Sequence, residues 1–178
     1  GVYSGALGFG YNKDLLAQNN LPGPKCWADL LKPEYKGQIQ MANPNSSGTA
    51  YTMLATIVQL MGEDAGFEYL KALHKNINQY TKSGSAPIKA AGLGETTIGI
   101  VFMHDAVAQT AAGFPIVTVA PCEGTGYEIG SMSLIKDSRN PEAARQFYDW
   151  ALTAEMQGKA KDVKSFQLPS NKSAAVSE

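Results

Sequence analysis

Cysteine is scarce in this sequence, and the two cysteines present form no recognisable motif. Cys26 and Cys122 lie far apart along the 178 residues. Their separation fits neither the ligand spacings of zinc sites nor the Cys-x-x-Cys pair of redox proteins. Two interpretations stay open: a single disulfide formed in an oxidising compartment, or two unrelated buried thiols.

An excess of charge of either sign is also absent. The chain has 15 Lys and Arg residues against 16 Asp and Glu, for a formal net charge of −1. A chain so nearly neutral lacks the basic surface that attracts nucleic acids and anionic membranes. Its apolar stretches are short and interrupted by polar residues, so none predicts a span of the bilayer. We therefore expect no nucleic acid partner.

Several motifs of well-known enzyme classes are missing too. The sequence has no Walker A pattern, and the glycines at 5, 8 and 10 come in the wrong order for the dinucleotide-binding G-x-G-x-x-G. It also lacks the G-x-S-x-G turn that presents a catalytic serine in hydrolases.

What the sequence does contain is an alternation of short strand patterns and helix patterns. Strands are expected at 3–12, 38–42, 77–81, 97–102, 115–120 and 127–135, and helices at 14–18, 27–31, 49–60, 64–75, 86–91, 106–112 and 141–157. The length suits one domain with its own core. The alternation predicts a single α/β domain over residues 1–178, with a mainly parallel sheet flanked by helices.

The segment from Asn43 to Thr49 lies between a strand pattern and a long apolar helix. The first turn of a helix has backbone N–H groups without partners and carries partial positive charge. Small hydroxyl residues and a glycine at that point let an anion approach closely. Ser46, Ser47, Gly48 and Thr49 are therefore candidate ligands of phosphate, carboxylate or a similar anion. The alternative is an ordinary serine or threonine helix cap.

A second segment, Ser83-Gly84-Ser85, repeats this arrangement. It follows the strand pattern at 77–81 and precedes the helix that ends near Ala91. Two such helix starts could converge on one ligand. We include Ser83, Gly84 and Ser85 in the candidate anion site, with Ala86 as a weaker candidate.

A third set of polar residues is expected near the same edge of the sheet. In open α/β sheets the ligand lies outside the carboxyl ends of the strands. His104 and Asp105 follow the strand at 97–102, and Glu128 follows a glycine-rich turn. An imidazole and two carboxylates can hold neutral hydroxyl groups, because carboxylates are strong acceptors.

Two other kinds of chemistry are open to these residues. Ser47, His104 and Asp105 could serve as nucleophile, base and orienting acid, but an aspartate adjacent to its histidine does not easily orient it. His104, Asp105 and Glu128 could supply mixed nitrogen and oxygen ligands to a metal ion. No paired His or Cys ligands reinforce that set. We therefore expect a binding protein without catalytic residues, metal or cofactor.

The order of motifs resembles the periplasmic solute-binding proteins of ABC transporters, of the class usually described as iron(III)-binding. The resemblance covers nearly the whole chain. It is carried by residues 8–16, 27–30 with 36–37, 43–49, 83–87, 94–99 and 140–144.

In that family two α/β lobes close on the ligand. The resemblance implies that this chain is the second, C-terminal-type lobe of a type II binding protein. Residues 1–5 do not resemble a signal peptide, so we expect an excised domain that lacks most of the first lobe.

The resemblance also implies a ligand class. The iron-binding members have a tyrosine pair where this sequence has Met103-His104. His104, Asp105 and Glu128 are instead similar to the hexose-phosphate-binding branch, in which such residues hold sugar hydroxyls and serine, threonine and glycine hold the phosphate. Tyr127 is a weaker candidate.

The resemblance, together with the candidate site residues, implies a monomeric bacterial periplasmic protein that captures a hexose phosphate or related organophosphate for an inner-membrane ABC permease. The alternatives are a ferric or other metal-ion binder, and a hydrolase of a phosphorylated sugar.

Overall fold

The computed structural model of the protein describes residues 1–176 and divides the chain into two compact units. Residues 6–127 form one unit, here called the sheet unit. Residues 1–5 and 128 onward form the other, here called the small unit. This division differs from the single domain predicted over residues 1–178. That the chain as a whole is the second lobe of a two-lobe protein stays a prediction.

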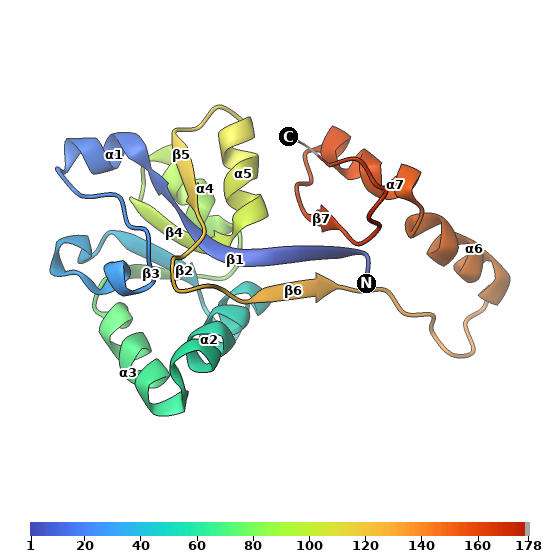
Figure 1. Ribbon diagram of the computed structural model, residues 1–178, viewed down its shortest axis with the longest axis horizontal. Coiled ribbons are helices and arrows are strands. Elements are labelled where there is room, and N and C mark those ends of the chain that lie inside the picture. The colour runs from blue at the N-terminus through green and yellow to red at the C-terminus, as the bar shows by residue number, and fades with distance from the viewer. Residues whose placement is uncertain (177–178) are drawn as a thin grey trace. The chain divides into compact units, whose positions relative to one another are not determined.

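The order of elements confirms the alternation of strands and helices (Figure 1). The strands are β1 (Tyr3–Asn12), β2 (Ile39–Ala42), β3 (Ile77–Thr81), β4 (Ile98–Phe102), β5 (Ile116–Val119), β6 (Tyr127–Gly130) and β7 (Leu168–Pro169). The α-helices are α1 (Lys13–Gln18), α2 (Gly48–Met61), α3 (Glu63–His74), α4 (Ala86–Leu93), α5 (Met103–Ala111), α6 (Pro141–Ala151) and α7 (Ala154–Gly158). Three short 3₁₀ helices cover Ala28–Leu31, Pro33–Tyr35 and Lys159–Val163.

The sheet is mixed, with strand order β3-β2-β4-β1-β5. β2 runs parallel to both β3 and β4, with Ala42 opposite Thr81 and Gln40 opposite Gly99. β1 runs antiparallel to β4 and to β5. The α/β class with flanking helices is confirmed, and the parallel part of the sheet is the part that carries the candidate site.

Alternate residues of the strands enter two separate cores. Ile98, Ile100 and Phe102 of β4 face the larger core, which α2 and α3 cover. Val101 faces the smaller core with residues of α4, α5 and β5. Because side chains alternate along a strand, the parallel strands are buried on both faces and read as apolar runs.

The glycines of β1 and β4 lie where helices approach the sheet most closely. A Cβ at Gly99 would lie 2.8 Å from the carbonyl carbon of Pro87 in α4, and one at Gly10 would lie 2.5 Å from Ile88 Cδ1. These contacts leave no room for a side chain, which explains the glycine-rich strand.

The small unit contains α6, α7 and β7, and β7 pairs with the first residues of β1. Gln157 is buried at its centre, where its amide nitrogen donates to Ala151 O and its amide oxygen accepts from Asn171 N at 2.8 Å. The predicted strand at 127–135 ends at Gly130, and the predicted helix at 141–157 is divided. Thr153 causes that division, because its hydroxyl caps a new helix by accepting from Met156 N.

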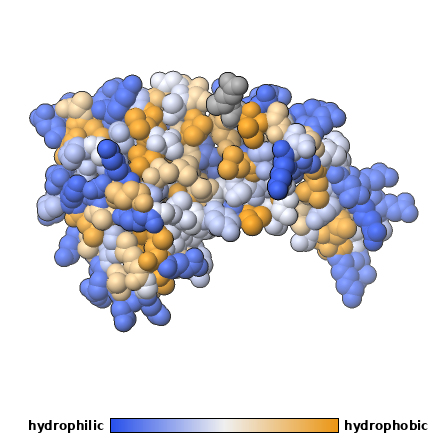
Figure 2. All heavy atoms as spheres, in the orientation of Figure 1, coloured by the Kyte–Doolittle hydropathy of each residue, from blue (hydrophilic) through white to orange (hydrophobic). Residues whose placement is uncertain are grey.

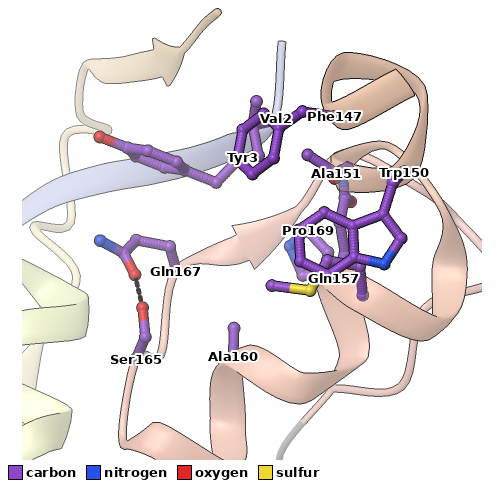
Figure 3. Close-up of a pocket in the computed structure, with 11 residues that line it drawn as sticks. Val2, Tyr3, Phe147, Trp150, Ala151, Gln157, Ala160, Ser165, Gln167 and Pro169 are labelled. Atoms are coloured by element: carbon purple, nitrogen blue, oxygen red, sulfur yellow. Dashed lines mark hydrogen bonds between the residues drawn. The ribbon is translucent and has the colours of Figure 1, made fainter. Parts of the chain in front are cut away.

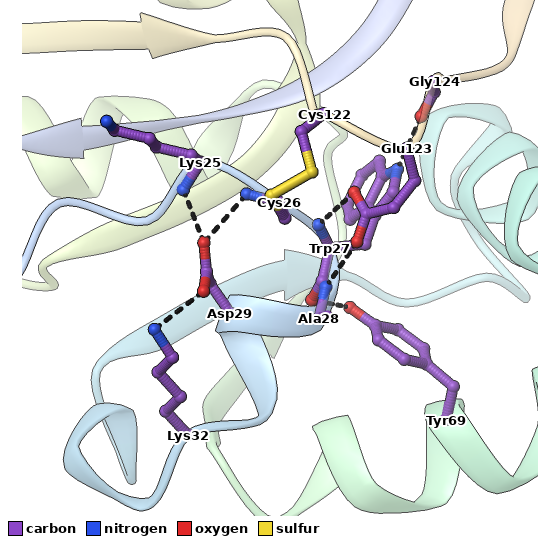
Figure 4. Close-up of a disulfide and its surroundings, with 10 residues drawn as sticks. All are labelled: Lys25, Cys26, Trp27, Ala28, Asp29, Lys32, Tyr69, Cys122, Glu123 and Gly124. Carbon is purple, nitrogen blue, oxygen red and sulfur yellow. Dashed lines mark hydrogen bonds and ion pairs between the residues drawn. A yellow bond between two sulfur atoms is a disulfide. The ribbon is translucent and has the colours of Figure 1, made fainter.

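Cys26 and Cys122 form a disulfide in the sheet unit, which decides between the two interpretations left open by the sequence (Figure 4). The Cα atoms are 4.7 Å apart and 96 residues separate them in sequence. Beside the disulfide, the Glu123 carboxylate accepts from Trp27 N and Ala28 N at 2.8 and 2.9 Å. The carboxylate thus caps the 3₁₀ helix at Ala28–Leu31, and the two loops are joined by a covalent bond and by hydrogen bonds.

Among the described residues, no helix is both long enough and apolar enough to cross a bilayer.

Removing the disulfide should lower the free energy of unfolding of the sheet unit by roughly 4–5 kcal/mol, because the unfolded chain regains the entropy of a loop of this length. The measurement is guanidinium unfolding of the Cys26→Ser/Cys122→Ser protein and of the parent, each with and without reductant. Reductant should shift the midpoint of the parent alone. A parent midpoint that reductant leaves unchanged would contradict the prediction.

Candidate anion-binding site

The start of α2 forms the first part of the candidate site. Ser47 is buried and has an extended backbone, and its Oγ accepts from Ala50 N at 3.4 Å. Ser47 is therefore the N-cap, as the sequence allowed. Gly48 and Thr49 occupy the next two positions, whose N–H groups have no acceptor within the helix.

The second predicted segment lies directly against this helix start. A Cβ at Gly84 would be 2.2 Å from Thr49 Oγ1 and 3.1 Å from Ser47 Oγ. Only glycine fits at this distance without displacing Thr49. The two segments, 35 residues apart between Thr49 and Gly84 (84 − 49), are brought together as expected.

Hydrogen bonds hold the two loops in this arrangement. Asn43 N donates to Thr81 O at 2.7 Å, and Ser46 Oγ contacts Lys82 O at 3.1 Å and Asn43 O at 3.3 Å. A serine hydroxyl has one proton, and here carbonyl oxygens accept it. Ser46 therefore ties the loops together, whereas the Ser47 hydroxyl accepts from the helix and keeps its proton for another partner.

All three predicted polar segments follow parallel strands. Residues 43–49 follow β2, residues 82–85 follow β3, and His104 and Asp105 follow β4. Since β2 lies between β3 and β4 and runs parallel to both, the segments emerge at one edge of the sheet. The helices α2, α4 and α5 begin at that edge, so their partial positive charges lie there. The edge favours an anion.

His104 and Asp105 lie in the first turn of α5, which begins directly after β4 at Met103. The His104 ring stacks on Phe102 with ring centres 5.4 Å apart. His104 Nε2 and Asp105 Oδ1 are 4.0 Å apart, at the outer limit of an ion pair. Burial raises the pKa of the Asp105 carboxyl group above its ordinary value, although the charges of His104 and Lys89 act to lower it.

Glu128 and Tyr127 are placed differently from the other candidates. Glu128 belongs to the small unit, where its Oε1 accepts from the Tyr3 hydroxyl at 3.2 Å. Tyr127 is the last residue of the sheet unit and is exposed. The inclusion of Glu128 in one site with His104 stays a prediction.

Two residues that sequence reasoning left out lie near the candidates. Phe102 stacks on His104, and Lys89 of α4 acts electrostatically on Asp105. The sequence could have indicated Lys89 as a neighbour of the candidate site, because it lies four residues after Ser85 and therefore one helical turn into α4. Phe102 gave no separate signal, because an aromatic residue that ends a buried strand normally belongs to the core.

Among the described residues, no group of three metal-ligating side chains lies at this edge. Within residues 1–176, Cys26, Cys122 and Glu123 are the one group of three His, Cys, Asp or Glu ligand atoms within 4.8 Å of one another. The two sulfur atoms are joined in the disulfide, so they are not available as thiolate ligands.

A family model for bacterial extracellular solute-binding proteins matches residues 1–178. The chain belongs to this family. The family places this chain among proteins that bind solutes, and it confirms the resemblance inferred from the order of motifs.

Individual proteins are similar over 99% of this chain. An uncharacterised protein of Haemophilus influenzae is 49% identical over 178 residues, which are 99% of this chain and 51% of that protein. The structure of the periplasmic binding protein AfuA from Actinobacillus pleuropneumoniae, with exogenous fructose-6-phosphate bound, matches with a TM-score of 0.93 and 49% identity over 99% of this chain and 56% of that one. The periplasmic binding protein P5PA matches with a TM-score of 0.91 and 40% identity over 99% of this chain and 56% of that one. This chain spans about half the length of the relatives it matches.

The contact between Gly84 and Thr49 predicts opposite effects for two glycine substitutions. Gly84→Ala should lower the free energy of unfolding by about 1–3 kcal/mol, because its Cβ overlaps Thr49. Gly48→Ala is the matched control, since a Cβ there has nothing within 4 Å. It should be neutral or stabilise by up to about 1 kcal/mol, because alanine favours the helix. Denaturant unfolding tests both, and equal effects would contradict the proposed packing.

The raised pKa of Asp105 predicts a pH-dependent effect of Asp105→Asn. The folded protein binds the proton of the Asp105 carboxyl group more tightly than the unfolded chain does. At pH values above the raised pKa, ionisation of Asp105 therefore lowers the free energy of unfolding. This loss disappears as the pH falls below the ordinary pKa of 3.8. Asp105→Asn should therefore stabilise the protein at pH 7, with a gain that shrinks toward pH 4. Unfolding curves at both pH values test this, and a variant that is less stable at pH 7 would refute it.

Proposed function

We propose that this chain supplies the phosphate-binding surface of a periplasmic protein that captures a hexose phosphate or related organophosphate. The observation that carries the proposal is the contact of Gly84 with Ser47 and Thr49. It brings two loops rich in serine and glycine together at neighbouring helix starts. That combination is well suited to an oxyanion with several oxygen atoms.

The donors in this arrangement have separate roles. The N–H groups of Gly48 and Thr49 point along the axis of α2, and the hydroxyl of Ser47 retains a proton to donate. No atom lies within 4 Å of the position that a Cβ would occupy at Gly48, so an anion can approach the backbone from that side. Ser83 and Ser85, whose hydroxyl oxygens are 3.5 Å apart, offer donors from the second loop. Ser46 and Gly84 hold the two loops in place.

The sugar would be held by the residues after β4. His104 and Asp105 present an imidazole and a partly buried carboxyl group at the same edge of the sheet as the phosphate donors. Their oxygen and nitrogen atoms suit hydroxyl groups, and directional hydrogen bonds of this kind select a hydroxyl pattern.

The similarity to AfuA supports this ligand class, because that structure holds fructose-6-phosphate and is 49% identical. The resemblance implies that iron-binding members of the family have a tyrosine pair at the position of Met103 and His104, and the absence of phenolate ligands there argues against ferric ion. The disulfide suits an oxidising compartment such as the periplasm. In this proposal a monomer delivers the ligand to an inner-membrane ABC permease, and closure around the ligand replaces catalysis.

An NMR titration of residues 1–178 with fructose 6-phosphate, inorganic phosphate and fructose tests the proposal, since NMR detects millimolar binding. The sugar phosphate should shift the amides of 47–49 and 83–85 together with those of His104 and Asp105. Gly48→Ala should weaken binding about tenfold or more, equivalent to about 1.4 kcal/mol, without loss of stability. Free fructose should cause no shifts at 47–49.

Other outcomes would point to other functions. If phosphate alone reproduces every shift, the edge is a general anion site. If ferric citrate binds the complete polypeptide, sugar phosphate does not, and His104→Ala leaves that affinity unchanged, the protein is a ferric binder. Release of phosphate from the sugar phosphate would identify a hydrolase.

A further inference from the structure

The imidazole of His104 lies against an aromatic ring of the protein core. The rings of His104 and Phe102 stack with their centres 5.4 Å apart and their planes 9° apart. Nearly parallel rings at this separation form a favourable aromatic pair. Phe102 is 4% exposed and the His104 side chain is 13% exposed, so the stack is largely shielded from water. One face of the imidazole is therefore in contact with a buried neighbour.

Phe102 joins the candidate site to the core that supports α2. It is the last residue of β4 and directly precedes α5. Its side chain belongs to the larger hydrophobic core, together with Ala50 and Met53 of α2. Ala50 is also the residue whose N–H donates to Ser47 Oγ. The same core thus supports both the helix start with the proposed phosphate donors and the aromatic ring on which His104 stacks.

The contact of His104 with Asp105 does not constrain the imidazole in the same way. His104 Nε2 and Asp105 Oδ1 are 4.0 Å apart, which exceeds the length of a hydrogen bond. A charge interaction at this distance depends little on the direction in which the imidazole points. The stack on Phe102, in contrast, constrains the plane of the ring, and the core fixes Phe102 itself.

A hollow in the small unit differs in kind from this edge of the sheet. It has a volume of about 280 Å³ and is lined by Tyr3, Phe147 and Trp150 among others (Figure 3). No Asp, Glu, His, Lys or Arg is among the described residues that line it. In Figure 2 apolar residues also show at the surface of the α6 region, between hydrophilic ones. Such surroundings disfavour a phosphate group, so we look for ligand selection at the edge of the sheet.

We propose that Phe102 is a positioning residue for sugar recognition, because its ring holds the imidazole of His104 ready to hydrogen-bond a hydroxyl group of the sugar phosphate. This role rests on the function proposed above. An imidazole that is already oriented loses little conformational freedom when the ligand binds, so the stack raises the affinity. Hydrogen bonds depend on direction, so a fixed imidazole favours one arrangement of hydroxyl groups. Phe102 therefore contributes to the choice of sugar and not to the binding of phosphate.

The substitution Phe102→Leu tests the proposal in residues 1–178, because leucine keeps the core apolar but has no ring to stack on His104. NMR titrations measure the affinities for fructose 6-phosphate and for inorganic phosphate. The affinity for the sugar phosphate should fall by about threefold to tenfold, which is the effect of ordering one side chain on binding. The affinity for inorganic phosphate should change by less than about twofold, because its proposed donors lie in other loops.

The substitution Phe9→Leu is the matched control. Phe9 is fully buried in the same core but lies in β1, where its ring packs on Trp27 with ring centres 5.7 Å apart. Both variants lose the same atoms from one core, so both should lower the free energy of unfolding, which denaturant unfolding measures. Only Phe102→Leu should change the ratio of the two affinities. An equal ratio in the two variants would overturn the proposal.

The ring signals of histidine provide a readout that a loss of core packing alone does not move. The chain has two histidines, and His74 stacks on Tyr80 instead. In Phe102→Leu the ring protons of His104 should lose the ring-current shift caused by Phe102, whereas those of His74 should keep their shifts. Unchanged His104 signals would overturn the proposal. If Phe102→Leu does not fold, Phe102→Met serves the same test, because methionine also lacks a ring and fills irregular gaps in cores.

The unsubstituted chain distinguishes a failure of this proposal from a failure of the proposed function. If it binds fructose 6-phosphate and Phe102→Leu keeps the same ratio of affinities, the proposed function stands and the role of Phe102 is wrong. If the unsubstituted chain does not bind fructose 6-phosphate, the proposed function is wrong, and the role of Phe102 in sugar recognition is wrong with it.

Discussion

The contact between Gly84 and the start of α2 is the constraint on which the candidate site depends. It places a loop from the end of β3 against the cap of the helix that follows β2. The parallel pairing of these strands sets the distance, and the absence of a side chain at Gly84 allows it. Ser46 and Asn43 then join the loops through backbone carbonyls. The helix cap, the glycine and the loop hydrogen bonds are each ordinary local features. The candidate site results from the register of the parallel strands, which brings these features together.

At the same edge of the sheet, two serine residues have different hydrogen-bonding roles. Ser47 caps a helix and still has a proton to donate, whereas the proton of Ser46 is directed to backbone carbonyls. Asp105 is partly buried, so its pKa is raised although the electrostatic effects of His104 and Lys89 act to lower it. Desolvation outweighs attraction there, because the charges of His104 and Lys89 do not compensate the loss of water.

The two units differ in what stabilises them. The sheet unit has apolar residues on both faces of its strands and a disulfide across 96 residues. The small unit relies on polar contacts around Gln157 and on short strand pairing. The sequence predicted a helix in the region of α6, and the structure shows that its apolar residues Phe147 and Trp150 are exposed. Periodicity identifies an apolar face but does not identify what covers it.

Local signals in the sequence determined most of the elements and the chemical character of the site. Apolar runs, glycines and cap residues located strands β1 to β6, helices α2 and α3 and the start of α6, because these signals act within a few residues. The break at Thr153 was missed, since its cap competes with an otherwise continuous helix pattern. Only the tertiary structure decided that Cys26 meets Cys122, that Gly84 meets Thr49 and that Glu128 lies in a different unit from His104. Contacts between distant residues depend on strand order and packing, which a single sequence does not encode in any local pattern.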